Sequence, residues 1–512
     1  MTERKHYDYI IIGSGAAGSV AAHHLSTANP DLHILVLEAG EKDKDRNIHN
    51  IGSFVKLWGS EHDWKLMTEP QPGLADRAIV INQGKVVGGG SSVNALMYVR
   101  GNPQNFDDWS AAGATGWSYK ELLPYFKALE DFEGGASEYH GVGGPLRIRD
   151  CPEAIMRSEE FLLAATEAGY DGPHWDYNGA RQENGAGYLQ FHVDDKGERV
   201  SGATAFLHPA LKQSKHLKLN VKSEATRLLI EKNRAVGVEY VHNGKTHHAY
   251  AHQEVIVSAG ALQTPKLLML SGIGAADHLQ ALNIPVVADL PGVGQNLQDH
   301  LQLPIVFRTQ DDRPKPSLLT GNALFVNTRI DTPDAAPDLQ LNFTPAVPAQ
   351  LAPMLDFGGP VCIFLAILVQ PKSLGEVKLR SSNPQDAPLL NPNYLQDAAD
   401  VQTLVKSIEI ARSIASTKAF AAMNVGEVVP GTTDPTAIEG FIRSQASTLW
   451  HPAGTCKIGQ DNDAVVDPQL RVRGIEGLRV ADASVMPTVT SGNTVAASFL
   501  IGAKVADMIL KG

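Results

Sequence analysis

A histidine and an asparagine near the end of the chain have the side chains of a base and its hydrogen-bonding partner. His451 lies in the segment Trp-His-Pro-Ala-Gly, and Asn493 follows in the segment Thr-Ser-Gly-Asn-Thr. Between them, a hydrophobic segment ends at Asp482. Histidine is the side chain best able to accept a proton near neutral pH. If this pair shares a cleft with a bound cofactor, His451 is where a substrate loses a proton.

The asparagine has a second interpretation. The Thr-Ser-Gly-Asn-Thr segment is typical of a helix N-cap, and the pattern after it predicts a closing helix from Thr494 to Leu510. Asn493 or Thr494 would then only cap that helix. Capping and function are compatible, because the N-terminus of the helix would also point at a bound cofactor. The sequence leaves both interpretations open.

A glycine-rich loop near the N-terminus has the pattern of a dinucleotide-binding turn. An apolar run over residues 7–12 predicts a buried strand, and a second strand is predicted over residues 33–37, ending at Glu38. A helical stretch joins the two strands. The loop between the first strand and the helix reads Gly13, Ser14, Gly15, Ala16, Ala17, Gly18.

Each glycine of this loop has a physical task in such a unit. Gly13 permits the tight turn, Gly15 lets the backbone approach a pyrophosphate, and Gly18 allows the helix to pack closely on the strand. The helix N-terminus offers unpaired N–H groups to the anion. Glu38 is placed to accept hydrogen bonds from a ribose diol, although an acid at a strand end is also an ordinary surface residue. The unit as a whole predicts dinucleotide binding.

The strand, glycine loop and helix alone do not distinguish FAD binding from NAD binding. Two further segments favour FAD. The strand that ends at Asp482 supplies an acid and backbone N–H groups late in the chain, where an extended cofactor needs a second anchor. The loop over residues 88–92 is a crowded, small-residue surface suited to close flavin contact. Its alternative interpretation is a flexible turn, but Asn94 and the apolar residues around it favour an ordered segment.

Composition and charge exclude several other classes of protein. The chain has 512 residues, of which 43% are hydrophobic and 20% charged, as in ordinary globular proteins. Its net charge of -12 argues against binding to nucleic acid or to anionic membrane surfaces. The longest apolar run, residues 361–369, is about half of a membrane-spanning helix. It predicts a buried strand, so we expect no membrane span.

Cysteine usage and the N-terminus predict a cytoplasmic protein. The three cysteines are far apart, and the N-terminus has no secretory pattern. We expect no metal site, because no ligand spacing typical of one occurs, and no Gly-x-Ser-x-Gly supports a hydrolase.

Cofactor-related patterns recur at the beginning, middle and end of the chain. Strand patterns cover residues 217–240, with a turn at residues 232–234, and a further strand is predicted over residues 254–258. A helix is predicted over residues 401–416. We therefore expect domains that are interdigitated along the sequence.

Four long motifs, in the same order and over nearly the whole chain, resemble those of the glucose–methanol–choline (GMC) flavin oxidoreductases. The first is GKVVGGGSSVN at residues 84–94, which continues through residues 98–101 to 108–109. The second and third are GALQTPKLLMLSGIG at residues 260–274 and PGVGQNLQDH at residues 291–300. The pair of His451 and Asn493 completes the match.

The resemblance implies a Rossmann-like α/β FAD-binding domain interdigitated with a substrate-binding domain built on an antiparallel sheet. We expect the FAD-binding domain over residues 1–155, 201–305 and 447–512, and the substrate-binding domain over residues 156–200 and 306–446.

The resemblance also implies the residues that bind FAD. They are Ser14, Gly15, Ala16 and Ala17 at the pyrophosphate, Glu38 at the ribose, Ser91, Asn94, Ala95, Leu96 and Met97 along the flavin, Ala225 at the adenine, and Asp482, Ala483 and Thr494 at the pyrophosphate and ring. Gly13, Gly18, Trp64 and Asn493 complete the predicted cofactor-binding set. Some members attach FAD through a histidine that precedes the loop asparagine. Val93 stands there in this chain, so we expect non-covalent FAD.

The implied reaction is the oxidation of an alcohol to an aldehyde or ketone. His451 accepts the hydroxyl proton as a hydride moves to flavin N5, and Asn493 holds the oxygen. The His–Asn form of this pair is that of choline-type and several aryl- and aliphatic-alcohol members. The electrons then pass to O₂, a quinone-like molecule or a protein. Alternatives are a lyase on the same scaffold, either a hydroxynitrile lyase or a photodecarboxylase, and a non-catalytic flavoprotein or NAD-binding regulator.

The substrate is expected to be a small-molecule alcohol. The family suggests broad use of primary alcohols, including aryl or furan alcohols. No carboxylate is evidently placed to pair with a quaternary ammonium, so choline is not specially favoured.

Overall fold

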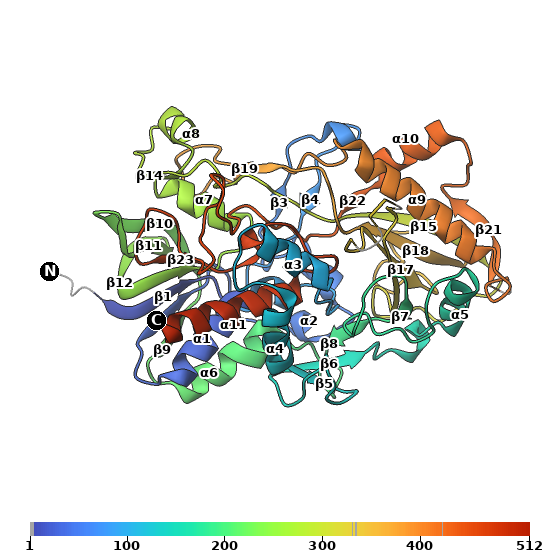
Figure 1. Cartoon of the computed structure of the whole chain (residues 1–512), viewed down its shortest axis with the longest axis horizontal. Coiled ribbons are helices and arrows are strands. Elements are labelled where there is room, and N and C mark those ends of the chain that lie inside the picture. Colours follow the sequence, from blue (N-terminus) through green and yellow to red (C-terminus); the bar gives the residue numbers. More distant parts are fainter. Residues whose placement is uncertain (1–4, 330, 333–334, 422) are drawn as a thin grey trace.

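A mostly parallel sheet, which we call the nucleotide sheet, forms one half of the molecule (Figure 1). The computed structural model describes residues 5–329, 331–332, 335–421 and 423–512. The order of neighbouring strands is β10-β11-β12-β1-β2-β9, and β23 pairs with β12. These strands are β1 (His6–Ile12), β2 (Ile34–Leu37), β9 (Leu217–Asn220), β10 (Ser223–Glu231), β11 (Arg234–His242), β12 (Lys245–Val257) and β23 (Leu478–Val480).

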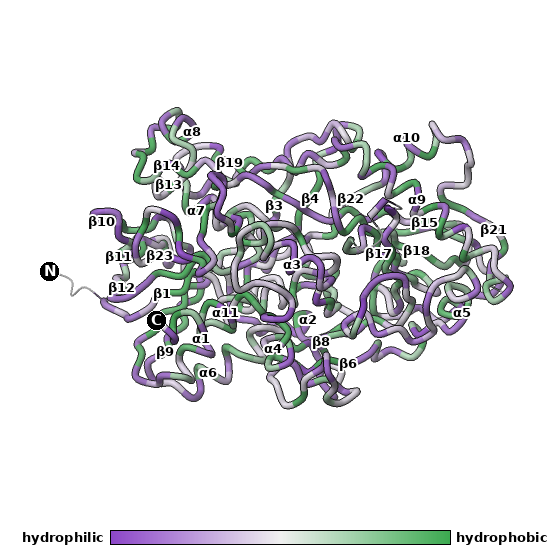
Figure 2. The backbone as a smooth tube through the Cα atoms, in the orientation of Figure 1, coloured by the Kyte–Doolittle hydropathy of each residue, from purple (hydrophilic) through white to green (hydrophobic). Residues whose placement is uncertain are grey.

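The strands at the centre of this sheet are buried along nearly their whole length. β2 reads Ile-Leu-Val-Leu and is fully buried, and β1 pairs in parallel with both β2 and β12. Continuous apolar runs of this kind are typical of parallel strands covered on both faces. The strand predicted over residues 254–258 is longer in the structure, because the polar first half of β12 pairs with β11 as an antiparallel edge hairpin. This outer part of the sheet is hydrophilic in Figure 2.

Two long helices lie side by side against the nucleotide sheet (Figure 1). They are α1 (Ala16–Ala28), which follows the glycine loop, and α11 (Val495–Lys511), which ends near the C-terminus. At Gly502 a side-chain Cβ would lie 2.3 Å from the carbonyl oxygen of Ala17, so the two helices approach through backbone contact. The first and last parts of the chain therefore share one core.

An antiparallel sheet, which we call the second sheet, forms the other half of the molecule (Figure 1). Its order is β21-β15-β18-β17-β16-β7, and β22 pairs with β15. The strands are β7 (Ala186–Tyr188), β15 (Leu301–Thr309), β16 (Asn322–Val326), β17 (Leu339–Thr344), β18 (Val361–Leu368), β21 (Asn424–Val429) and β22 (Ser447–Thr448). The apolar run predicted as a buried strand is β18.

Helices cover one face of the second sheet. The longest is α9 (Ala398–Ala415), close to the predicted helix, and it packs on β18, β15 and β17. The core between them is aromatic, with Phe161 stacked on Phe343 at a centroid distance of 4.9 Å. The prediction of an α/β fold with a second, antiparallel part is confirmed. The residue bounds of the two domains stay a prediction.

The remaining elements are mostly shorter. The remaining helices are α2 (Arg46–His49), α3 (Pro103–Ala111), α4 (Tyr119–Leu129), α5 (Glu159–Glu167), α6 (His208–Gln213), α7 (Gln263–Leu270), α8 (Ala276–Ala281) and α10 (Pro435–Gln445). The remaining strands are β3 (Leu66–Met67), β4 (Val80–Ile81), β5 (Glu130–Phe132), β6 (Leu146–Asp150), β8 (Gln190–His192), β13 (Ile273–Gly274), β14 (Ala288–Asp289), β19 (Glu376–Lys378) and β20 (Leu389–Asn391). In the described part of the chain, no helix combines the length and apolarity needed to cross a bilayer.

Candidate active site

The carboxyl ends of four parallel strands meet at one edge of the nucleotide sheet. Gly13 follows β1, Glu38 follows β2, Ser258 follows β12, and the segment after β23 leads to Asp482. Ligands of open α/β sheets bind at this edge, because loops and helix N-termini converge there. A cavity runs along this edge, and Gly13, Glu38, Ser258 and Asp482 all line it.

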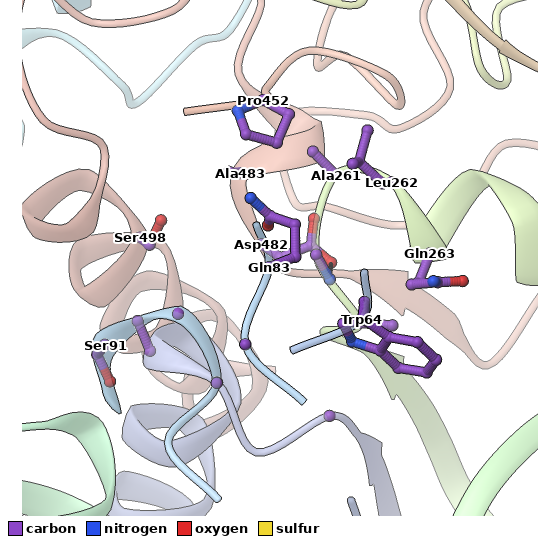
Figure 3. A pocket seen from close by; sticks show the side chains of 18 of the residues that line it. Trp64, Gln83, Ser91, Ala261, Leu262, Gln263, Pro452, Asp482, Ala483 and Ser498 are labelled. Atoms are coloured by element: carbon purple, nitrogen blue, oxygen red, sulfur yellow. Dashed lines mark hydrogen bonds between the residues drawn. The ribbon is translucent and has the colours of Figure 1, made fainter. Parts of the chain in front are cut away.

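Most of the predicted site residues line this cavity. They are Gly13, Gly15, Ala16, Ala17, Glu38, Trp64, Ser91, Asn94, Ala95, Leu96, Met97, Ala225, His451, Asp482, Ala483, Asn493 and Thr494. In Figure 3, Trp64 and Gln263 lie at one side of the cavity, Ser91 and Ser498 at the other, and Asp482 with Ala483 between them. The structure therefore brings together residues from the beginning, middle and end of the chain.

Ser14 and Gly18 do not line the cavity but shape the loop from behind. The backbone N–H and the hydroxyl of Ser14 both donate to Glu38 Oε2, at 3.1 and 2.6 Å. At Gly18 a Cβ would lie 2.1 Å from the carbonyl oxygen of Gly13, so only glycine fits there. These two residues hold the turn between β1 and α1 in place.

The Glu38 carboxylate is largely engaged with the protein itself. In addition to the bonds from Ser14, its Oε1 accepts the N–H of Gly40 at 2.8 Å. Burial raises the pKa of this carboxyl, and the hydrogen bonds from Ser14 and Gly40 oppose that effect. The Glu38 carboxylate therefore already holds the glycine loop in place. The predicted hydrogen bond from a ribose would use the lone pairs of Glu38 that remain free.

The N-terminus of α1 is open toward the cavity. Its N-cap is Gly15, no side chain caps it, and the first turn carries no acidic residue. The first N–H groups of a helix have no intrahelical acceptor, and the helix dipole adds positive potential there. This end of the cavity is therefore suited to a phosphate-like anion.

The second glycine loop touches the first. Gly89 has a φ of 53°, in the left-handed region, and a Cβ on it would lie 2.7 Å from the Cα of Gly15. Both residues line the cavity. The close approach of these two backbones forms part of the cavity wall.

A buried arginine, which sequence reasoning missed, holds the Asn94 segment. Arg199 donates to both oxygens of Asn94, at 2.5 Å to Oδ1 and 2.7 Å to the carbonyl, and to the carbonyl of Ser91 at 3.2 Å. The Asn94 amide in turn donates to Nε2 of His192 at 3.2 Å. Burial lowers the pKa of Arg199. Arg199 lies outside the motifs, and its position follows only from the tertiary fold.

The Asp482 carboxylate also organises protein groups. Its oxygens accept the N–H of Gly260 at 2.9 Å, the hydroxyl of Thr264 at 2.6 Å and the N–H of Ser484 at 2.8 Å. Asp482 thus joins the end of β12, the start of α7 and its own turn at the cavity wall. Residues of the 260–274 motif that line the cavity were not predicted individually; they are Gly260, Ala261, Leu262, Gln263, Lys266, Leu267 and Leu270.

The predicted adenine end is shaped by Trp64 and Ala225. The ammonium of Lys85 lies over the Trp64 ring, 4.2 Å from its centroid, and also 3.4 Å from a carboxylate oxygen of Glu224. Ala225 lines the cavity together with Ser223.

His451 and Asn493 lie side by side in the same cavity. The Asn493 amide Nδ2 is 3.2 Å from His451 Nε2, and its Oδ1 is buried without a partner. Of the two interpretations that the sequence left open for this segment, the structure places Thr494 at the N-cap position of α11 and shows no capping hydrogen bond from a side chain. Asn493 instead points to the histidine.

The pairing of β15 with β22 sets the backbone of His451. Leu301 pairs with Thr448, and the N–H of Leu449 donates to the carbonyl of His300 at 2.8 Å. Asp299 Oδ1 then accepts the N–H of His451 at 2.7 Å. Asp299 and His300 belong to the motif at residues 291–300, but the sequence did not show that this motif contacts His451.

Burial controls the protonation of this end of the cavity. It lowers the pKa of His451 to about 3, so the ring is neutral near neutral pH. It raises the pKa of Asp299 to about 6, against hydrogen bonds from Thr448, Tyr394 and the backbone. A neutral imidazole offers a lone pair, which is what a proton acceptor requires.

Aromatic and aliphatic side chains line the cavity together with His451 and Asn493. Trp450 and Trp58 both line the cavity, with ring centroids 4.7 Å apart. Leu449 and Leu319 add aliphatic surface. Trp450 has a φ of 62°, a strained conformation for a non-glycine residue, which turns the chain immediately before His451.

Comparison with known proteins finds family models and relatives that match nearly the whole chain. The models described as GMC oxidoreductase match residues 7–302 and residues 371–502. The mitochondrial choline dehydrogenase of Homo sapiens is 39% identical over 551 residues, covering 99% of this chain and 90% of the human protein. A Pseudomonas putida protein named alcohol dehydrogenase [acceptor] is 37% identical over 538 residues, covering 99% of this chain and 96% of that protein.

A solved structure has the same fold over the whole chain. Pyridoxine 4-oxidase from Mesorbium loti superimposes with a TM-score of 0.90 at 33% sequence identity. The superposition covers 99% of this chain and 99% of that chain. The similarity therefore includes both sheets and the segments that line the cavity.

Proposed function

Because this chain belongs to the GMC oxidoreductase family, we propose that His451 and Asn493 are the catalytic pair of its alcohol oxidation. The protein is an FAD-dependent enzyme that acts on CH–OH donors. Its relatives are named as dehydrogenases and oxidases, and no comparison supports a lyase on this scaffold. The residue roles below are our proposal.

The cavity has the features that FAD requires. The open N-terminus of α1 fits a pyrophosphate, and Gly15 and Gly89, whose backbones approach each other closely, both line the cavity beside it. The segment from Ser91 to Met97 fits the flavin, and Ala225 and Trp64 fit the adenine end. Bound FAD supplies the two-electron oxidant that takes a hydride from the alcohol carbon.

His451 accepts the hydroxyl proton of the alcohol at Nε2. Its Nδ1 is occupied by a neighbouring histidine, His300, at 2.9 Å, so Nε2 is the nitrogen that faces the cavity. The low pKa keeps this nitrogen unprotonated before the reaction. A positioned base of this kind contributes about 10²–10⁴-fold to a reaction rate.

Asn493 orients the substrate oxygen. Its Nδ2 donates toward His451 Nε2, and an alcohol oxygen that binds between the two receives the amide N–H while its own hydroxyl donates to the imidazole. As the proton leaves, the amide N–H stabilises the negative charge that develops on the oxygen. The contact of 3.2 Å between Asn493 Nδ2 and His451 Nε2, in the cavity that begins at the glycine loop, carries the proposal.

The substrate that fits the catalytic end is a neutral, largely apolar primary alcohol, such as an aryl or alkyl alcohol. Trp58, Trp450 and Leu449 supply aromatic and aliphatic contacts there. The carboxylates that line the cavity are Glu38, Glu224 and Asp482 among the described residues, and each is engaged near the nucleotide sheet. A quaternary ammonium would find aromatic rings there, but among the described residues no carboxylate beside His451 lines the cavity, because Asp299 lies behind the ring and accepts hydrogen bonds from the protein.

We therefore expect benzylic and medium-chain primary alcohols to reduce the bound flavin faster than choline does. Holoenzyme is mixed anaerobically with each alcohol, and the loss of flavin absorbance is followed by stopped-flow. Oxygen uptake and reduction of a quinone dye then distinguish O₂ from a quinone-like acceptor. A flavin that no alcohol bleaches would contradict the proposed roles, and choline as the best substrate would contradict the substrate class.

Non-covalent binding of FAD is a further expectation. Val93, which precedes Asn94, lines the cavity and has no nucleophilic atom that could bond to a flavin. Precipitation of the holoenzyme with acid should release all of the flavin into the supernatant. A yellow pellet after washing would show a covalent bond from another residue.

A further inference from the structure

A second buried histidine lies directly behind the proposed base. His300 is fully buried, and its Nδ1 is 2.9 Å from Nδ1 of His451, with the two rings nearly perpendicular at 87°. His300 does not line the cavity, so it cannot touch the substrate. Two Nδ1 atoms at this distance form a hydrogen bond, in which one nitrogen carries the proton and the other accepts it.

We propose that His300 is a positioning residue that accepts the Nδ1–H of His451 and thereby fixes the base in the tautomer whose Nε2 lone pair faces the substrate. This inference rests on the proposed role of His451 and deepens it. A neutral imidazole has one donor and one acceptor nitrogen, so the partner of one nitrogen decides the state of the other. If His300 donated instead, Nε2 of His451 would carry the proton and could not act as a base.

The hydrogen bond on the cavity side of the pair agrees with this assignment. Asn493 presents Nδ2, a donor, to Nε2 of His451, which must then be an acceptor. At the other end, the backbones of Val369 and Thr490 lie near the His300 ring, but His300 Nε2 is buried and makes no hydrogen bond with the described residues. Donation therefore runs inward, from Asn493 Nδ2 to Nε2 of His451 and from Nδ1 of His451 to Nδ1 of His300.

The surroundings also keep both rings neutral. Burial lowers the pKa of His300 well below its usual value, and the neighbouring His451 adds to that effect. Asp299 is directed elsewhere: its carboxylate accepts from Tyr394, Thr448 and the N–H of His451, and no bond to either imidazole ring is present. A neutral acceptor therefore takes the place that a carboxylate holds in a serine-hydrolase triad.

Two substitutions separate the acceptor role from simple packing. His300→Asn keeps an acceptor oxygen near the position of Nδ1, whereas His300→Leu has similar volume but no acceptor. We expect His300→Leu to slow flavin reduction at saturating alcohol by about 10- to 100-fold with little change in alcohol affinity. His300→Asn should stay close to the wild-type rate. His24→Leu, which removes a half-buried imidazole from α1, is the control and should change neither.

Flavin content and thermal unfolding are measured for each variant, so that misfolding is recognised. Equal rates in the His300→Asn and His300→Leu variants, either both normal or both lost, would overturn the inference.

A direct measurement of the tautomer needs no turnover. Long-range ¹H–¹⁵N spectra of ¹⁵N-histidine-labelled, FAD-free protein report which ring nitrogen carries the proton, and a His451→Gln variant assigns the signals. Protonated Nδ1 in His451 supports the inference, and protonated Nε2 overturns it. If no alcohol reduces the wild-type flavin, the proposed function fails, while the spectra still decide the tautomer.

Discussion

Replacing His451 with alanine should give a protein that binds FAD normally but whose flavin is reduced by alcohol about 10²–10⁴-fold more slowly. The substitution removes the one neutral imidazole nitrogen that faces the cavity beside Asn493. Without this nitrogen, water is the only acceptor left for the hydroxyl proton of the alcohol. Anaerobic stopped-flow with a saturating alcohol measures the rate constant, and the visible spectrum measures bound flavin.

The His451 experiment has a matched control in the same chain. His24→Ala also removes an imidazole whose pKa is lowered by burial, to about 4, but this half-buried ring lies on α1 away from Asn493. It should retain the wild-type rate. Flavin reduction in the His451→Ala variant at the wild-type rate would remove His451 from the role of base. Loss of flavin in that variant would instead point to a structural role for the ring.

Replacing Gly89 with alanine should weaken FAD binding by about 10- to 10³-fold. A Cβ at this position would lie 2.7 Å from Gly15 Cα, and the φ of 53° is unfavourable for any residue with a side chain. Overpacking and backbone strain together cost about 2–4 kcal/mol, and about 1.4 kcal/mol corresponds to a factor of ten. The two loops must separate to relieve the clash, which distorts the wall that holds the cofactor. Titration of FAD into apoprotein measures the affinity.

The neighbouring glycine provides the control for this variant. Gly90 also lines the cavity, but a Cβ there would meet no protein atom within 4 Å, and its φ is not in the left-handed region. Gly90→Ala should therefore leave the thermal unfolding of FAD-free protein unchanged. Wild-type FAD affinity in the Gly89→Ala variant would show that the contact between the loops is not needed for binding.

Local sequence was sufficient for the elements that are held by short-range interactions. The strand, glycine loop and helix at residues 6–28 follow from an apolar run, a turn that needs glycine and helical spacing within a short stretch of chain. β18 and α9 were predicted within a few residues of their observed bounds for the same reason. The family motifs added the order of the cofactor-related segments, and with it the fold and the type of reaction.

The partners of individual polar groups were decided only by the tertiary structure. Asn493 has the sequence context of a helix cap, yet its amide points to His451, because α11 packs on α1 while β22 pairs with β15. The contact of His300 with His451 depends on that same strand register.

His451 and Asn493 were therefore recognisable from the sequence as a possible base and its partner, and the family resemblance gave them a cofactor. Which nitrogen of His451 is free, what holds the ring and why it is neutral were not readable there. Those properties depend on burial and on hydrogen bonds between residues far apart in the chain, such as His300 and His451. A linear pattern specifies which groups are present, whereas the packing of the two sheets specifies which of them meet and how much water remains around them.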